Sequence, residues 1–301
     1  MSHHHSHKHK HDSTENRLWI SIFLNLGITI AEVIGGILSN SLALISDALH
    51  NLSDTTSLGI SLIARKISKR SPNRQKTFGY KRAEIIAAFI NLVTLVFIAL
   101  FLIKEAVERF FDPQPVIGSI MLWVAVAGLA GNVITAILLY RDSKTNINIK
   151  SAYVHIFWDA ISSVAVIIGG IIIWLYGLYV VDTIITVLIS VYILYHSFHL
   201  LKETIDILME STPDDIEISE IEHSIETIPH VLDAHHVHVW NLNEEHRLLE
   251  CHVKIDRSKA DDLEKIKSDI KNLLMKKFSI NHSTLEFELE HCGDKEKESC
   301  Y

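Results

Sequence analysis

The stretch "DALHNLSD", residues 47–54, places two aspartates and a histidine inside a long apolar run. On a helix His50 and Asp54 share one face because they lie four residues apart, and Asp47 precedes His50 by three residues on the same side. Ionisable side chains at membrane depth cost roughly a few kcal/mol each and by default mark an ion pathway. The stretch therefore predicts a membrane span that carries part of an ion site.

Apolar segments of about 20 residues, the length that crosses a bilayer as a helix, surround this stretch on both sides. Hydrophobic residues make up 48% of the 301-residue chain, and the mean hydropathy of +0.23 is high for a soluble protein. The sequence after Glu210 has the composition of a soluble domain instead. We expect six spans, at roughly 18–38, 42–64, 83–103, 117–140, 151–175 and 178–201.

Charge in the connecting loops predicts the orientation of these spans. The connection 65–82 holds eight Lys and Arg residues and no acid, whereas the loops 39–41 and 176–179 carry no charge. The positive-inside rule places the basic loop in the cytoplasm. Because the number of expected spans is even, both termini are predicted to be cytoplasmic. The formal net charge of −8 argues against a nucleic-acid partner.

The sequence pattern of the soluble part predicts a small two-layer domain of helices and strands. A helical pattern in 213–230 is followed by two β-rich segments, "VLDAHHVHVWNL" and "HRLLECHVKID", an amphipathic helix over 258–278 and a strand over 283–290. The order is α-β-β-α-β. The sequence thus divides into a flexible His-rich head (1–16), a membrane domain (17–207), a cytoplasmic domain (208–291) and a charged tail (292–301).

A second histidine–aspartate pair, with the same four-residue spacing as His50 and Asp54, lies on the fifth expected span. The segment "HIFWD" places His155 and Asp159 four residues apart. Two such pairs supply two imidazole nitrogens and two carboxylate oxygens, a complete tetrahedral shell for zinc. A His–Asp hydrogen bond between helices would also explain one pair, and a proton relay would explain all four residues but not the histidines elsewhere in the chain. Two copies on separate spans favour the metal.

Histidines recur elsewhere in the chain. The segment "MSHHHSHKHKHD" at the start is either a purification tag or a flexible metal collector, and its interruption by serine and lysine favours the collector. In the soluble domain, a cluster on or near adjacent strands indicates a second metal site, although each of its histidines alone would be typical of a protein surface: His235, His236, His238, His252, His282 and Glu288. Strand alternation predicts that His236 and His238 face away from His235.

Cysteine usage favours a reducing compartment for the soluble part. All three cysteines, Cys251, Cys292 and Cys300, lie there, and their odd number and spacing do not resemble a disulfide framework. A cytosolic location is the simpler interpretation.

The chain resembles the cation diffusion facilitators, in particular their zinc-efflux branch. The resemblance rests on "SLALISDALHNLSD" (41–54), "TFGYKRAEIIAAFIN" (77–91), "SAYVHIFWDAISSVAVIIGG" (151–170) and "DAHHVHVW" (233–240). It implies a transporter of six transmembrane helices with a ferredoxin-like cytoplasmic domain, which acts as a homodimer and exchanges zinc for protons. Many relatives keep a His-rich segment between the fourth and fifth spans, whereas here the N-terminal head is the rich one.

The resemblance also assigns site residues. The implied transport site is His50, Asp54, His155 and Asp159, with His50 typical of zinc selectivity. The implied cytoplasmic site, where zinc would act as a regulator, is His235, His252, His282 and Glu288.

We expect a secondary transporter that exports Zn²⁺ from the cytoplasm against inward proton flow, in a bacterial plasma membrane rather than an organelle. A metal-gated channel and a membrane-bound zinc sensor that transports nothing are the alternatives. A closed four-ligand shell disfavours a channel because it holds its ion too firmly. An enzyme is disfavoured because zinc catalysis leaves one position for water and no nucleophile or base motif accompanies the pairs.

Overall fold

The computed structural model describes residues 8–140, 142–144, 147–243 and 245–289, with the side chains of 8–22 and of a few later residues, Asp54 among them, outside the description. It divides into two compact units. The first holds the chain up to Ile63 together with Ile90–Leu201, and the second holds Ala64–Phe89 together with the chain from Lys202. Residues 1–7 of the predicted head and all of the predicted tail lie outside the described residues.

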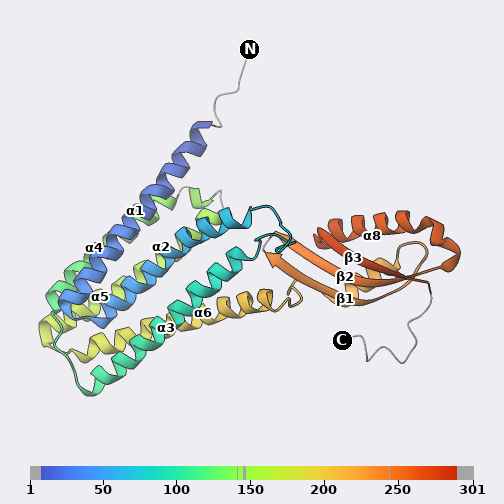
Figure 1. Cartoon of the computed structure of the whole chain (residues 1–301). Helices are drawn as coiled ribbons and strands as arrows, with labels where there is room; N and C mark the ends of the chain where they lie inside the picture. The colour runs from blue at the N-terminus through green and yellow to red at the C-terminus, as the bar shows by residue number, and fades with distance from the viewer. Residues whose placement is uncertain (1–7, 141, 145–146, 244, 290–301) are drawn as a thin grey trace, which may run out of the picture. The chain divides into compact units, whose positions relative to one another are not determined.

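Long helices build the first unit (Figure 1). They are α1 (Lys8–Ser39), α2 (Leu42–Ser68), α3 (Ala83–Phe111), α4 (Gly118–Tyr140), α5 (Ile147–Tyr176) and α6 (Val180–Leu208), with a short 3-10 helix, η1 (Asp142–Lys144), before α5. Helix α1 starts at Lys8, so residues 8–16, predicted to be part of a flexible head, are helical. No proline or glycine interrupts them, and a formed helix extends at little cost.

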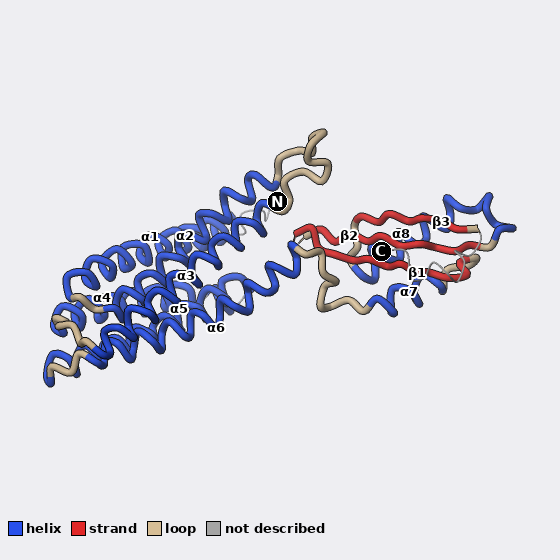
Figure 2. Tube along the Cα trace, turned by 60° about the horizontal axis from the view of Figure 1, so that its bottom comes forward, coloured by secondary structure: helices blue, strands red, loops and turns tan. Residues whose placement is uncertain are grey.

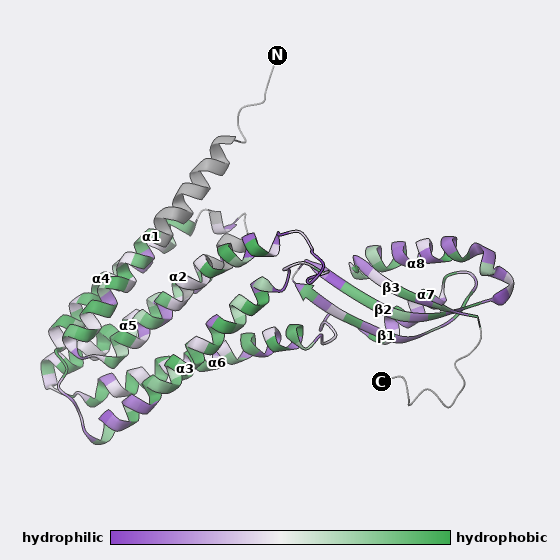
Figure 3. Ribbon diagram, viewed as in Figure 1, coloured by the Kyte–Doolittle hydropathy of each residue, from purple (hydrophilic) through white to green (hydrophobic). Residues whose placement is uncertain are grey.

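Four of the described helices are long and apolar enough to cross a membrane: α3, α4, α5 from Tyr153, and α6. The 29 residues of α3 span roughly 44 Å at about 1.5 Å each, more than the hydrocarbon core requires. The described apolar part of α1, Phe23–Ser39, is shorter. In Figure 3 apolar residues dominate the helices of this unit. Large apolar side chains also face outwards, among them Phe97, Phe101 and Trp123, as expected where lipid is the solvent.

Asp182 on α6 fixes the start of α2. Its Oδ1 accepts a hydrogen bond from Ser41 Oγ at 2.6 Å, and its Oδ2 accepts one from the Leu42 N–H at 2.8 Å. Ser41 Oγ in turn accepts from the Leu44 N–H at 3.1 Å. Helix N-termini leave N–H groups without partners, which is costly away from water. The carboxylate satisfies them and thereby sets the axial position of α2, the helix that carries His50.

The second unit contains a three-stranded sheet with two helices. Its elements follow in the order α7 (Ile218–Glu226), β1 (Val231–Asn243), β2 (His246–Ile255), η2 (Arg257–Asp262), α8 (Leu263–Phe278) and β3 (His282–Glu288). Strand β2 is central, antiparallel to β1 and parallel to β3 (Figure 2). The amphipathic segment predicted as one helix over 258–278 is divided, because Lys259 inside η2 has non-helical φ and ψ angles.

One apolar core joins the helices to one face of this sheet. Ile221 and Ile225 of α7 and Ile270 of α8 pack with alternate strand residues such as Leu249 and Val253. The other strand residues therefore point to the opposite face, which the two helices leave open.

Cys251 lies within this core and is fully buried. Burial raises the pKa of its thiol to about 12. At pH 8 only about one thiol in ten thousand is then ionised, and the thiolate is the reactive species. We expect Cys251 to resist iodoacetamide in the native protein and to react once the domain is unfolded in guanidinium chloride. Peptide mass spectrometry checks this, and rapid alkylation of Cys251 in the native protein would contradict it.

Candidate metal centres

A group of residues that could hold a metal ion, called the metal group below, lies between α2 and α5 in the first unit. The carboxylate of Asp159 is placed between two imidazoles: Oδ1 is 3.9 Å from Nε2 of His50, and Oδ2 is 3.6 Å from Nε2 of His155. The two rings meet edge to face with centroids 5.8 Å apart. The Asp159 side chain is 4% exposed, whereas that of His155 is 42% exposed. The group is thus buried at its carboxylate and open along one side.

The distances from Asp159 to His50 and to His155 are too long for hydrogen bonds between these atoms and are compatible with a cation bound between them. Distances of 3.6 and 3.9 Å exceed hydrogen-bonding range. Two ligands bound to zinc at about 2.0–2.2 Å with tetrahedral angles lie roughly 3.3–3.6 Å apart. One ligand atom from each of His50, His155 and Asp159 lies within 4.8 Å of the others. Small side-chain movements suffice to close this group on a metal ion.

Asp54, the fourth predicted ligand, belongs to α2, but its side chain lies outside the described residues. Its backbone position is one helical turn after His50 on the same face. Its role as a ligand stays a prediction.

Two buried acidic residues of the first unit were not singled out from the sequence. Glu32 on α1 is fully buried and accepts a hydrogen bond from Asn51 Nδ2 at 2.9 Å. Asp182, described above, is 1% exposed. Both interrupt apolar runs, "TIAEVIGG" and "YVVDTIIT", in the same way as Asp47. A search for single acids within spans would have found them.

A second ligand group lies on the open face of the sheet in the second unit. Glu288 Oε1 is 2.9 Å from His252 Nδ1, and Glu288 Oε2 is 3.5 Å from His235 Nε2. The three residues offer ligand atoms within 4.8 Å of one another. Asp233 Oδ2 lies 2.9 Å from Nδ1 of His235, on the side of the ring away from Glu288.

A β-bulge in β1 lies at this group. Because of it, the side chains of β1 do not alternate between the two sheet faces as predicted. His235 is opposite His252, but the next pair is His238 with Glu250, so β1 holds one extra residue. His236, at the bulge, has φ +50°. Its ring stacks on that of His252 with centroids 5.2 Å apart, and the ring of His235 lies 5.5 Å from His252. The expectation that His236 faces away from His235 was wrong, because the extra residue breaks the two-residue period.

The structure does not bring His282 to this group. His282 is the first residue of β3 and Glu288 the last, which separates them by roughly 20 Å at about 3.3 Å per residue. The His282 ring instead contacts Phe78, with centroids 5.9 Å apart. Glu286 is closer, since its Oε2 lies 3.5 Å from Nε2 of His252. Three of the four predicted residues therefore lie together, with Glu286 beside them, and the structure places His282 apart from them.

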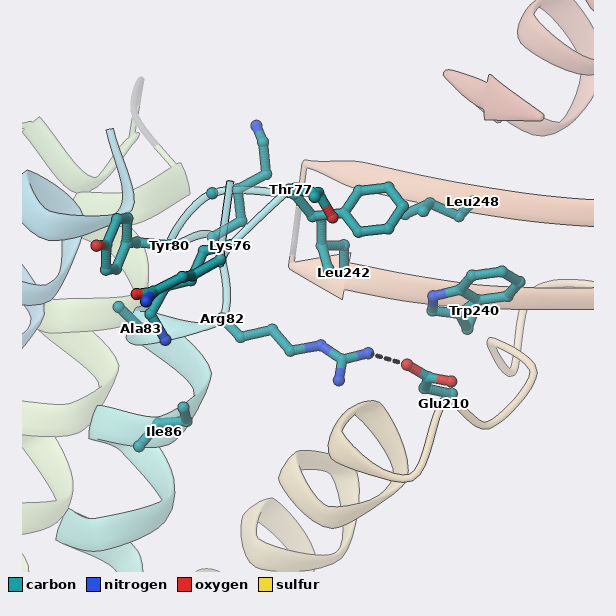
Figure 4. Close-up of a pocket in the computed structure, with 14 residues that line it drawn as sticks. Lys76, Thr77, Tyr80, Arg82, Ala83, Ile86, Glu210, Trp240, Leu242 and Leu248 are labelled. Carbon is teal, nitrogen blue, oxygen red and sulfur yellow. Dashed lines mark hydrogen bonds and ion pairs between the residues drawn. The ribbon is translucent and has the colours of Figure 1, made fainter. Parts of the chain in front are cut away.

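A pocket of about 460 Å³ lies elsewhere in the second unit, beside the "FGYKR" segment. Figure 4 shows Arg82 directed at Glu210, with Trp240 on the far side. The Arg82 Nη2 and Glu210 Oε1 atoms are 2.5 Å apart. This ion pair ties the segment before α3 to the residues after α6. Among the described residues, the pocket holds no cluster of metal ligands.

Comparisons with known proteins find relatives that match nearly the whole chain. The chain matches the family model of the cation efflux transmembrane domain over residues 18–209, and that of the cation efflux protein cytoplasmic domain over residues 213–290. It is 38% identical to the zinc transporter ZitB of Pectobacterium atrosepticum, over 98% of this chain and 91% of that protein. It is also 38% identical to a cadmium, cobalt and zinc/H(+)-K(+) antiporter of Bacillus velezensis (96% and 92%). Identity is 39% with the metal cation efflux system protein CzcD of Cupriavidus metallidurans (92% and 88%).

Proposed function

This chain belongs to the cation efflux family of membrane transporters, and on that premise we propose that it exports Zn²⁺ from the cytoplasm in exchange for protons. The observation that carries the proposal is the Asp159 carboxylate held between His50 and His155 on two different helices. Asp54 completes a shell of two imidazoles and two carboxylates. That ligand set suits zinc, the metal named for the ZitB relative.

Exchange follows from the chemistry of these ligands. Zinc binds neutral imidazole and ionised carboxylate, so protons compete with it for the same atoms. The unperturbed pKa of histidine, about 6.5, places this competition near physiological pH. If the group opens alternately to each side, protons from a more acidic outside displace zinc there and return with the empty group. No separate proton site is required.

The proposal includes six membrane spans, one for each helix of the first unit, with both termini in the cytoplasm. The basic connection 65–82 supports that orientation. The bacterial relatives support a plasma membrane. The His-rich start of the chain is proposed to collect metal, ahead of a membrane domain (17–207), a cytoplasmic domain (208–291) and a charged tail (292–301).

A homodimer with a ferredoxin-like cytoplasmic domain completes the proposal. The order of helices and strands in the second unit and its match to the cytoplasmic-domain family support it. Zinc held by His235, His252 and Glu288 would act there as a regulator, because the group lies on the sheet face that the helices leave open.

Zinc flux into liposomes tests the proposal. Purified protein is reconstituted around an indicator of free zinc, and zinc is added outside with the lumen acidic. We expect zinc to accumulate above its external concentration and the accumulation to collapse with a protonophore. Flux that only equilibrates zinc would indicate a channel, and binding without flux would indicate a sensor.

Selectivity gives a prediction for His50. His50→Asp replaces an imidazole by a carboxylate, an oxygen ligand that suits harder ions. We expect the ratio of zinc to manganese flux to fall by roughly tenfold while zinc transport persists. His196→Asp, at an exposed position of α6, is the matched control. An unchanged ratio in His50→Asp would exclude His50 as a selectivity element.

A further inference from the structure

Asp47 lies one turn of α2 before His50 and is 2% exposed. Its carboxylate faces α5, the other helix of the metal group. Oδ1 accepts a hydrogen bond from Ser162 Oγ at 2.6 Å, and Oδ2 lies 3.5 Å from Ser163 Oγ. These contacts form a bridge between the two helices that hold the ligands. We call Asp47, Ser162 and Ser163 the α2–α5 bridge.

Both serines of the bridge have a second acceptor. The backbone carbonyl oxygen of Asp159 lies 2.8 Å from Ser162 Oγ and 3.0 Å from Ser163 Oγ. A hydroxyl group carries one proton, so each serine donates either across to Asp47 or back to its own helix. The bridge can therefore be released without leaving either serine unsatisfied. The Asp47 carboxylate alone then needs a new partner, which water can supply once the space opens.

The bridge lies to one side of the metal group. Along α2 it is nearer the α1–α2 turn than His50, and along α5 it follows Asp159. Beyond it, Ala43, Leu44 and Val166 belong to one buried apolar cluster. The bridge and this cluster together separate the metal group from the end of the unit that carries the α1–α2 turn.

We propose that Asp47 is a positioning residue for transport: through Ser162 and Ser163 it holds α2 against α5 and closes the metal group towards the α1–α2 turn. This inference rests on the proposed function, which places that turn outside the cell. Release of the bridge accompanies the opening through which zinc leaves, and its re-formation returns the group to the state that loads zinc from the cytoplasm.

Ser162→Ala tests the bridge by removing its shortest hydrogen bond. If the bridge stabilises the loading state, its loss lowers the population of that state, and the apparent affinity falls by the same factor. We expect the KM for zinc in reconstituted flux to rise about five- to tenfold, with the maximal rate changed less than about twofold. An unchanged KM would overturn the proposal.

Two variants separate the bridge from a general loss of packing. Ser162→Thr keeps the hydroxyl and is expected to restore the wild-type KM. Ser190 on α6 is buried, and its Oγ lies 3.5 Å from Ser46 Oγ, so it links α2 to a helix without predicted ligands. Ser190→Ala is therefore the matched control and should leave the KM unchanged. A rise as large as that of Ser162→Ala would overturn the proposal.

Cysteine accessibility supplies a readout that does not need transport. Val166 is fully buried beyond the bridge. In the full chain, Val166→Cys should react with a small maleimide several-fold faster when combined with Ser162→Ala than alone, and no faster with Ser190→Ala. Peptide mass spectrometry distinguishes this site from the native cysteines. Equal rates in all three proteins would overturn the bridge, whereas wild-type protein that moves no zinc would overturn only the proposed function.

Discussion

Asp159→Asn is expected to lower zinc flux into proteoliposomes by more than roughly a hundredfold, since loss of even an outer-shell partner of a metal ligand costs about 10- to 100-fold. Asp159 offers one carboxylate oxygen to each of the two histidines. The asparagine side chain has nearly the same shape but no charge, and its nitrogen has no lone pair to offer a metal. The group then keeps one amide oxygen at this position but loses the negative charge and the second carboxylate oxygen.

His155→Ala should have a comparable effect, because it removes the imidazole on the other side of Asp159. The matched controls are Asp112→Asn, at an exposed residue after α3, and His196→Ala, at an exposed residue of α6. Gel filtration and the melting temperature in detergent show whether each variant is folded. Near-normal flux in folded Asp159→Asn or His155→Ala would refute the assignment of the metal group.

The membrane part of the fold could be read from the sequence because each span is encoded locally. Apolar length predicts a helix, and a histidine and an aspartate four residues apart share one face. The family was also identified correctly from its motifs. The pairing of α2 with α5 could not be derived in this way. It depends on contacts such as that of Asp47 with Ser162, 115 residues apart in the chain.

The cytoplasmic group shows where local patterns fail. The two-residue period of a strand predicts opposite faces for His235 and His236, but a bulge places both rings beside His252. A bulge is set by register with the neighbouring strand, which the sequence of β1 alone does not contain. His282 was grouped with the others because it lies on or near a neighbouring strand and because the family resemblance implies it. Six residues of extended strand separate the two side chains by roughly 20 Å.

The group of His235, His252 and Glu288 predicts that zinc strengthens the association of two cytoplasmic domains. The apolar core of this domain comes entirely from residues between Ile221 and Ile280, so a fragment of residues 208–301 should fold by itself. The fragment carries 22 acidic and 11 basic side chains. Two copies therefore repel each other until cations lower the local negative charge. Zinc at the open sheet face can favour the dimer only by binding it more tightly than it binds the monomer.

We expect the fragment to dimerise at least about tenfold more tightly with zinc than with a chelator, a difference of about 1.4 kcal/mol or more. His252→Ala should abolish the difference, because His252 contacts both Glu288 and Glu286. His282→Ala is the matched control, since the His282 ring contacts Phe78 rather than the ligand group. Sedimentation velocity with and without zinc measures each dissociation constant. If His282→Ala removes the zinc effect as His252→Ala does, His282 belongs to the site as the four-residue prediction has it; if zinc changes neither wild type nor variants, these histidines have no regulatory role in dimerisation.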